Sequence, residues 1–245
     1  MRWRSARGCT VGTASGVELK ASAIIVGAGS GVRLGSSVPK AFVKIGGRTM
    51  LSYSLVTVRQ VSSIDEVVIT VPAGFENAAR AEVAAAGLGV PVKIAPGGIE
   101  RQDSVRIALE LTSAESEIVI VHDAARPLST PAIFEACIIA ATRIGGAIAA
   151  IPVADTLKRV ADGAINATVA RAGLWQAQTP QAFRRDLLIA AHQRAVVEKI
   201  TATDDADLVE RAGARVEVVE APTENIKITT PSDLAIVEAI IAARK

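Results

Sequence analysis

A glycine-rich loop and two cations between residues 26 and 40 have the types and spacing of a phosphate-binding site. The loop follows the short apolar run Ala21–Val26, and its glycines let the backbone turn tightly with N–H groups facing an anion. These glycines are Gly27, Gly29, Gly31 and Gly35. Arg33 lies inside the loop and Lys40 just beyond it. The segment lacks the Gly-Lys-Ser/Thr of a P-loop and the third small residue of a dinucleotide fingerprint, so it predicts another kind of nucleotide site and disfavours an oxidoreductase.

Three later segments place small, polar or charged residues in positions where they could meet this loop. A Gly-Gly turn ending at Gly98 opens a helix with Ser104 in its first turn, and Asp123 and Ala124 directly follow an apolar strand. Lys227 lies near the end of the chain. Ligands of open parallel sheets bind beyond the carboxyl ends of the strands, so we expect these residues to converge with the glycine loop on one site.

Short apolar strands alternate with helical stretches after Ala21, and this order predicts a doubly wound α/β fold with a mostly parallel sheet. The predicted strands are Ala23–Val26, Glu66–Val71, Val92–Ala95, Ile118–His122, Ala147–Pro152, Val216–Val219 and a short piece at Ile226–Ile228. The predicted helices are Met50–Val61, Phe75–Ala86, Asp103–Thr112, Pro131–Arg143, Arg184–Lys199, Asp205–Ala212 and Pro231–Ala243.

The stretch Asp155–Gly173 interrupts this alternation. It is more polar than its surroundings, and Asp162-Gly163 is a hairpin turn signal between two segments of strand character. A lone two-stranded hairpin is only marginally stable in water, so we expect a projecting β-arm that a partner subunit covers. The sequence therefore predicts a homodimer with the arm at about residues 155–173.

Composition and charge limit the class of protein. Half of the 245 residues are apolar, which suits one large domain over residues 21–245. No apolar run has the length that spans a bilayer, so we expect a soluble protein without a membrane partner. Cys9 and Cys137 lack metal-ligand or redox spacing and fit a reducing cytoplasm.

The net charge of +2 is concentrated at the N-terminus, because residues 1–20 carry four basic residues and one acid, which gives +3 there and −1 for residues 21–245. The domain is therefore not expected to bind nucleic acid. Residues 1–20 are Arg-rich and acid-poor like a transit peptide, which would suit a plastid, but a disordered extension of a cytoplasmic protein or a misassigned start codon is the simpler interpretation.

Seven motifs from residue 21 to the C-terminus together resemble the 2-C-methyl-D-erythritol 4-phosphate cytidylyltransferases of non-mevalonate isoprenoid synthesis. The motifs, in family order, are the glycine loop with Pro39-Lys40, GG-x-x-R-x-x-S, HDAARP, DT-x-K-R, R-x-GLW-x-A-x-TPQ, TDDA and NIKIT. The resemblance implies transfer of a cytidylyl group from CTP to methylerythritol phosphate, with Mg²⁺ as cofactor and pyrophosphate as second product.

The resemblance also implies a role for each matched residue. The nucleotide would be held by Gly27, Ala28, Gly29, Gly98, Ser104, Asp123 and Ala124. Arg33, Lys40 and Lys227 would act on the phosphates as catalytic cations, and Asp123 would lie by Mg²⁺, which CTP phosphates mostly hold. The acceptor would be held by Thr156, Arg171, Thr179 and Thr203, with Arg171 from the neighbouring subunit.

The residues themselves agree with such chemistry. Attack of one phosphate on another depends mostly on alignment and on cations, and a phosphate monoester is a nucleophile near neutral pH because its second pKa is about 6. No general base is therefore required. Two alternatives stay open: a cytidylyltransferase for ribitol 5-phosphate or glycerol phosphate, and a non-catalytic nucleotide-binding regulator, which would not need three cations aimed at phosphates.

Overall fold

The computed structural model describes residues 19–29, 31, 34–36 and 38–244. Arg33 and residues 1–18 of the predicted extension therefore lie outside the described residues. Within the described part of the chain, no helix combines the length and apolar composition that crossing a bilayer requires.

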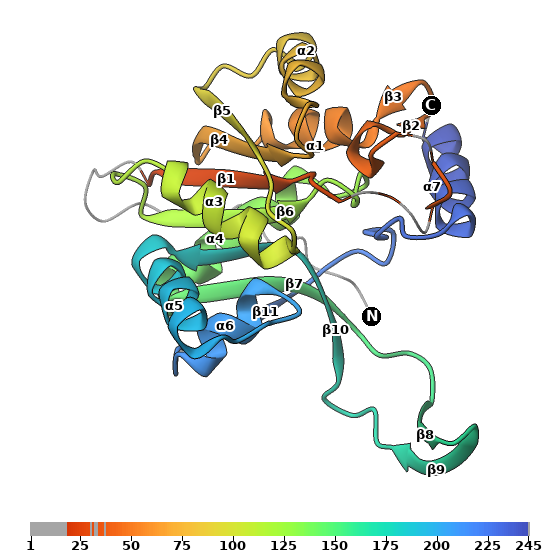
Figure 1. Cartoon of the computed structure of the whole chain (residues 1–245). Coiled ribbons are helices and arrows are strands. Elements are labelled where there is room, and N and C mark those ends of the chain that lie inside the picture. The colour runs from red at the N-terminus through yellow and green to blue at the C-terminus, as the bar shows by residue number, and fades with distance from the viewer. Residues whose placement is uncertain (1–18, 30, 32–33, 37, 245) are drawn as a thin grey trace, which may run out of the picture.

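A seven-stranded sheet forms the centre of the molecule (Figure 1). Its strands are β1 (Ala21–Val26), β4 (Ile64–Val71), β5 (Val92–Pro96), β6 (Ile118–Asp123), β7 (Gly146–Pro152), β10 (Trp175–Arg184) and β11 (Glu217–Glu220). Their order is β11-β7-β10-β6-β1-β4-β5, and every neighbouring pair is parallel except the two pairs that β10 makes. The predicted mostly parallel α/β sheet is confirmed.

Helices cover both faces of this sheet. The helices are α1 (Met50–Val58), α2 (Glu76–Ala86), α3 (Arg101–Leu111), α4 (Pro131–Ile144), α5 (Arg185–Glu198), α6 (Asp205–Arg211) and α7 (Pro231–Ala243). One core cluster joins the sheet to α1, α2 and α4, and a second joins it to α3, α5 and α6. All seven predicted helices form, with ends that differ by up to three residues.

Helix α7 lies beside the sheet and packs on a small hairpin of β2 (Lys44–Ile45) and β3 (Arg48–Thr49), which the sequence analysis did not predict. A third apolar cluster holds this hairpin, α7 and Ile228 together. The short 3-10 helix η2 (Lys40–Phe42) precedes the hairpin and carries Lys40. The C-terminal helix thereby fixes the segment that ends the glycine loop.

Strand β10 was missed because its sequence is polar and contains Pro180, and proline argues against a central strand. In the structure the pairing with β7 is irregular between Ala177 and Gln181, so Pro180 lies where no regular ladder is needed. Gln178, Thr179 and Gln181 are buried, but each is hydrogen-bonded, and their partners are Asn225, Asp123 at the end of β6, and Asp204.

The predicted strand at Ile226–Ile228 was wrong. Ile228 N donates to Ala125 O at 2.9 Å, and the preceding Asn225 bonds to the loop after β6 and to β10. The segment therefore lies against these loop groups, while β11 occupies the sheet edge next to β7.

The predicted β-arm is present as β8 (Leu157–Ala161) and β9 (Ala164–Val169), paired antiparallel. The turn at Asp162 and Gly163 has positive φ at both residues, 52° and 77°, as a two-residue hairpin loop requires. Figure 1 shows the hairpin standing away from the body on the extensions of β7 and β10, and nearly all of its residues are exposed.

Candidate active site

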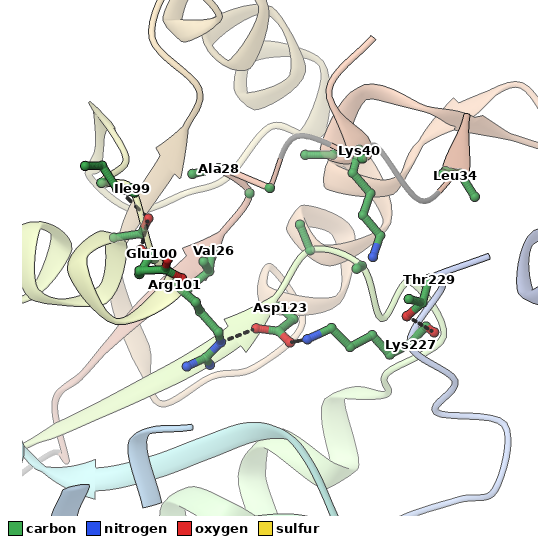
Figure 2. Close-up of a pocket in the computed structure, with 18 residues that line it drawn as sticks. Val26, Ala28, Leu34, Lys40, Ile99, Glu100, Arg101, Asp123, Lys227 and Thr229 are labelled. Carbon is green, nitrogen blue, oxygen red and sulfur yellow. Dashed lines mark hydrogen bonds and ion pairs between the residues drawn. The ribbon is translucent and has the colours of Figure 1, made fainter. Parts of the chain in front are cut away.

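A cavity of about 380 Å³ opens where β1, β5 and β6 end at one edge of the sheet (Figure 2). Nine of the predicted site residues line it, and they are Gly27, Ala28, Gly29, Lys40, Gly98, Ser104, Asp123, Ala124 and Lys227. The side chain of Lys40 extends into this space. The expected convergence of the glycine loop with the three later segments is therefore observed.

Close backbone packing shapes the wall of this cavity. A Cβ added at Gly97 would lie 2.3 Å from the Cβ of Ala28 and 2.8 Å from Ser104 Oγ, so only glycine lets the two turns approach. Ser104 is buried, and its Oγ accepts from Gly98 N at 3.1 Å and donates to Glu100 O at 3.2 Å. Its hydroxyl thus shapes the turn that borders the cavity.

Two glycine variants should separate cavity shape from fold stability. A Cβ at Gly29 meets nothing within 4 Å, so Gly29→Ala should leave the Tm unchanged while weakening CTP binding about ten-fold, or about 1.4 kcal/mol, because the methyl group enters the cavity. Gly97→Ala should lower stability by about 1–3 kcal/mol through overpacking. Calorimetry measures the CTP affinity of each variant and thermal unfolding measures its stability. Gly89→Ala, at an exposed glycine, is the control. Native CTP affinity of Gly29→Ala would show that the loop does not border the nucleotide.

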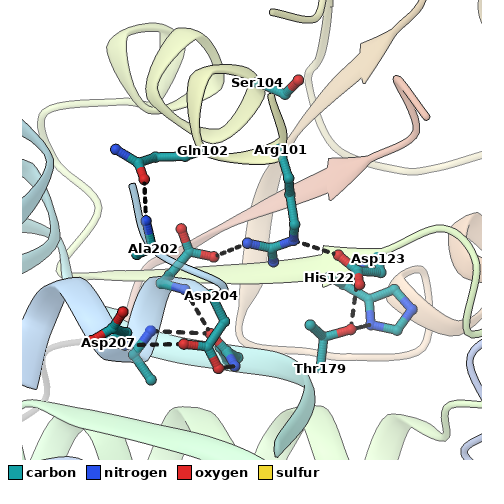
Figure 3. Close-up of polar contacts among 12 residues, drawn as sticks. Arg101, Gln102, Ser104, His122, Asp123, Thr179, Ala202, Asp204 and Asp207 are labelled. Atoms are coloured by element: carbon teal, nitrogen blue, oxygen red, sulfur yellow. Dashed lines mark hydrogen bonds and ion pairs between the residues drawn. The ribbon is translucent and has the colours of Figure 1, made fainter. Parts of the chain in front are cut away.

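A chain of ion pairs crosses the floor of the cavity. Lys227 Nζ lies 2.5 Å from Asp123 Oδ2, and Arg101 Nε lies 2.9 Å from Asp123 Oδ1. Arg101 Nη1 continues the chain to Asp205 Oδ2 at 2.7 Å (Figure 3). Burial would raise the pKa of Asp123, but Arg101 and Lys227 outweigh burial and hold it well below its usual range. Asp123 therefore remains a carboxylate between two cations.

A second cavity, of about 180 Å³, lies on the other side of this chain. The two cavities share Arg101, Asp123 and Lys227, and the rest of the second one is lined by Arg126, Ala177, Gln178, Thr179, Gln181, Thr203 and Asp204. Arg126 is held by its Nη1, which donates to Asn225 O at 2.7 Å. Arg126 Nε and Arg101 Nη2 are buried and have no hydrogen-bond partner among the described residues. The guanidinium of Arg126 on the wall of this cavity favours a bound anion.

The four predicted acceptor-binding residues separate into two pairs. Thr179 and Thr203 line the second cavity, where Thr179 Oγ1 accepts from Asp123 N at 3.0 Å. Thr156 and Arg171 are exposed on the arm and line neither cavity, and Arg171 Nη1 donates to Ala154 O. The fold thus brings only the first pair to the site of their own chain.

Sequence reasoning did not select Arg101 and Arg126, although both stand inside recognised motifs. Arg126 directly follows the turn after β6, and Arg101 is the first residue of α3. Each arginine follows a strand and has no acid four residues before or after it in the sequence, and this pattern could have identified both as site residues.

His122, which the sequence analysis did not select, is buried, and burial lowers its pKa to about 3. Its ring is therefore neutral, and the centroid of the ring lies 5.0 Å from the ring centroid of Phe134.

The described residues contain no group of three or more His, Cys, Asp or Glu that could hold a metal ion. Asp123 lines both cavities, and each of its oxygens already accepts from a cation. This donor set fits a Mg²⁺ ion that triphosphate oxygens and water hold, with at most one protein ligand.

Comparison with known proteins identifies close relatives. The family model for 2-C-methyl-D-erythritol 4-phosphate cytidylyltransferase matches residues 21–243. The proteins of that name from Pelotomaculum thermopropionicum and Deinococcus radiodurans are 42% and 44% identical over 228 and 221 residues, covering 92% and 90% of this chain and 96% and 89% of theirs. The crystal structure of 4-diphosphocytidyl-2C-methyl-D-erythritol synthase from Anaerococcus prevotii superposes with a TM-score of 0.82 at 29% identity, covering 92% of this chain and 97% of that one. The match extends over the whole described domain and both cavities, and the chain belongs to the 2-C-methyl-D-erythritol 4-phosphate cytidylyltransferase family.

Proposed function

We propose that this protein transfers the cytidylyl group of CTP to 2-C-methyl-D-erythritol 4-phosphate, with release of pyrophosphate. The observation that carries the proposal is the pair of adjoining cavities with the Lys227–Asp123–Arg101 chain between them. One cavity has the glycine backbone and Lys40 that a triphosphate needs, and the other has the guanidinium of Arg126, a cation that an acceptor phosphate needs.

In the proposed reaction an oxygen of the acceptor phosphate attacks the α-phosphorus of CTP. The new P–O bond forms as the bond between the α-phosphorus and the bridging oxygen breaks, and the electron pair leaves with pyrophosphate. Lys40 stabilises the charge on the triphosphate side, and Lys227 stands at the boundary between the two cavities. The resemblance implies the same role for Arg33 as for Lys40. Asp123 holds the Lys227 ammonium and takes no proton.

We further propose a homodimer in which the arm completes the partner's acceptor cavity. Large apolar side chains are exposed along the arm and its stem, and they are Leu157, Val160, Ile165, Leu174 and Trp175. Exposed apolar patches of this kind mark interfaces. Arg171 and Thr156 would then reach the acceptor of the neighbouring chain, since they line neither cavity of their own.

The proposed cofactor is Mg²⁺, which the triphosphate would hold and which would neutralise part of its charge; Asp123 is the one described residue proposed to contact it. The proposed location is the cytoplasm, where CTP is made. Residues 1–20 are proposed as an extension outside the catalytic domain of residues 21–245, since the family match begins at residue 21.

Nucleotide choice and acceptor choice test the proposal. Small residues at positions 27–29 and 98 leave backbone groups bordering the first cavity. We propose that these groups match the edge of cytosine, so CTP should bind more tightly than ATP, GTP or UTP. Pyrophosphate release with CTP and Mg²⁺ should be fastest with methylerythritol phosphate in a panel that includes ribitol 5-phosphate and glycerol phosphate. ATP binding as tight as CTP binding would exclude a cytidylyltransferase, and a faster second acceptor would reassign the substrate within the same chemistry.

A further inference from the structure

We propose that Arg101 is a positioning residue: anchored by Asp205, it holds Asp123 and, through Asp123, the ammonium group of Lys227 at the boundary between the two cavities. The inference rests on the proposed function, because it explains how the cation between the two phosphates is held. Arg101 itself is required to touch neither substrate.

The guanidinium of Arg101 spans two carboxylates at once. Its Nε donates to Asp123 Oδ1 at 2.9 Å, and its Nη1 donates to Asp205 Oδ2 at 2.7 Å (Figure 3). Only a planar fork with separate donors can make both bonds from one rigid group. Burial lowers the pKa of Arg101, but Asp205 and Asp123 raise it by more, so the charge is permanent.

Asp205 is a fixed anchor for this fork. It is 1% exposed, its Oδ1 lies 3.1 Å from His192 Nε2 on α5, and its backbone N donates to Gln181 Oε1 on β10 at 3.2 Å. Gln102 ties the same region to α3, because it accepts from Ala202 N at 2.9 Å and donates to Ile200 O at 3.1 Å. Helix α5 and strand β10 therefore fix Asp205, and Gln102 fixes the start of α3 against the segment before α6, so the position of Arg101 between them is restricted.

The position of Arg101 is unfavourable for the stability of α3, so helix formation does not explain why an arginine stands there. It is the first residue of α3, where the helix dipole disfavours a cation. Two acids offset this cost, and one of them, Asp123, also holds Lys227. By sharing the charge of Asp123, Arg101 leaves more of the positive charge of Lys227 for the phosphates. Loss of Arg101 would let the carboxylate rotate and pair with Lys227 alone.

A double-mutant cycle on kcat tests this chain of contacts. Arg101→Lys keeps the charge but cannot bridge both acids, so kcat should fall about 10- to 100-fold, since a misplacement of about 1 Å can cost about 100-fold. The KM for CTP should change less than about three-fold because the glycine loop and Lys40 are untouched. In an Asp123→Asn background, Arg101→Lys should cause little further loss, since the contact through which it acts is already weakened.

Arg106→Lys on the same helix, which changes only an exposed pair with Glu110, is the matched control and should keep native kcat. If Arg101→Lys does not fold, Asp205→Asn replaces it in the same cycle. The positioning role would be overturned if the variant lowered kcat by the same factor with and without Asp123→Asn, or if the variant kept the native kcat. Release of pyrophosphate by the native protein that requires both CTP and acceptor tests the proposed function separately.

Discussion

Replacing Lys40 by alanine is expected to lower kcat by on the order of 100-fold, with a much smaller rise in the KM for CTP. Lys40 lies at the end of the glycine loop, and its side chain extends into the larger cavity. Negative charge develops on the α-phosphoryl group and the departing pyrophosphate as attack proceeds, so a cation there stabilises the transition state more than the ground state. Steady-state pyrophosphate release measures both constants.

Lys44→Ala is a suitable control, because Lys44 is an exposed cation on the nearby strand β2 and lines neither cavity. Arg33→Ala is expected to behave like Lys40→Ala, as the resemblance implies for a residue inside the loop. Near-native kcat in both variants would make these residues ordinary surface charges and would remove the proposed mechanism.

Mixing two inactive variants is expected to restore activity if Arg171 acts in the neighbouring chain. Lys40→Ala and Arg171→Ala chains should each be nearly inactive alone. In a mixed dimer with a shared site, one site lacks both groups and the other keeps both. With random pairing in a two-fold dimer, half of the dimers are mixed and about a quarter of all sites are intact, so about a quarter of native activity should return.

This second experiment depends on the arm standing apart from its own site. Arg171 is exposed on the arm and lines neither cavity of its chain. Co-refolding of the two variants, with mixed dimers verified by mass, gives the measurement, and a mixture of Lys40→Ala with Lys227→Ala is the control that should stay inactive. The same low activity in the Lys40→Ala and Arg171→Ala mixture would place Arg171 in its own chain's site and leave the cytidylyl transfer proposal intact.

The sequence by itself determined the parts that depend on local pattern. Alternation of apolar strands and amphipathic helices predicted the parallel sheet, because helices that follow each strand bury their apolar faces against a sheet of parallel strands. Asp162-Gly163 predicted the arm, because few residue pairs adopt positive φ twice in succession. Glycines and cations after strands predicted the larger cavity, because parallel strands bring their carboxyl ends to one edge.

Only the tertiary structure decided the features that join distant segments. Strand β10 inserts antiparallel between β6 and β7, and its polar residues gain partners from loops far away in the sequence. One chain of ion pairs joins residues that lie far apart in the sequence, and they are Arg101, Asp123, Asp205 and Lys227. The first and last of them, Arg101 and Lys227, are 126 residues apart. No local preference specifies such pairing, because whether a charge is buried and which partner it meets depend on how the whole sheet and its loops pack.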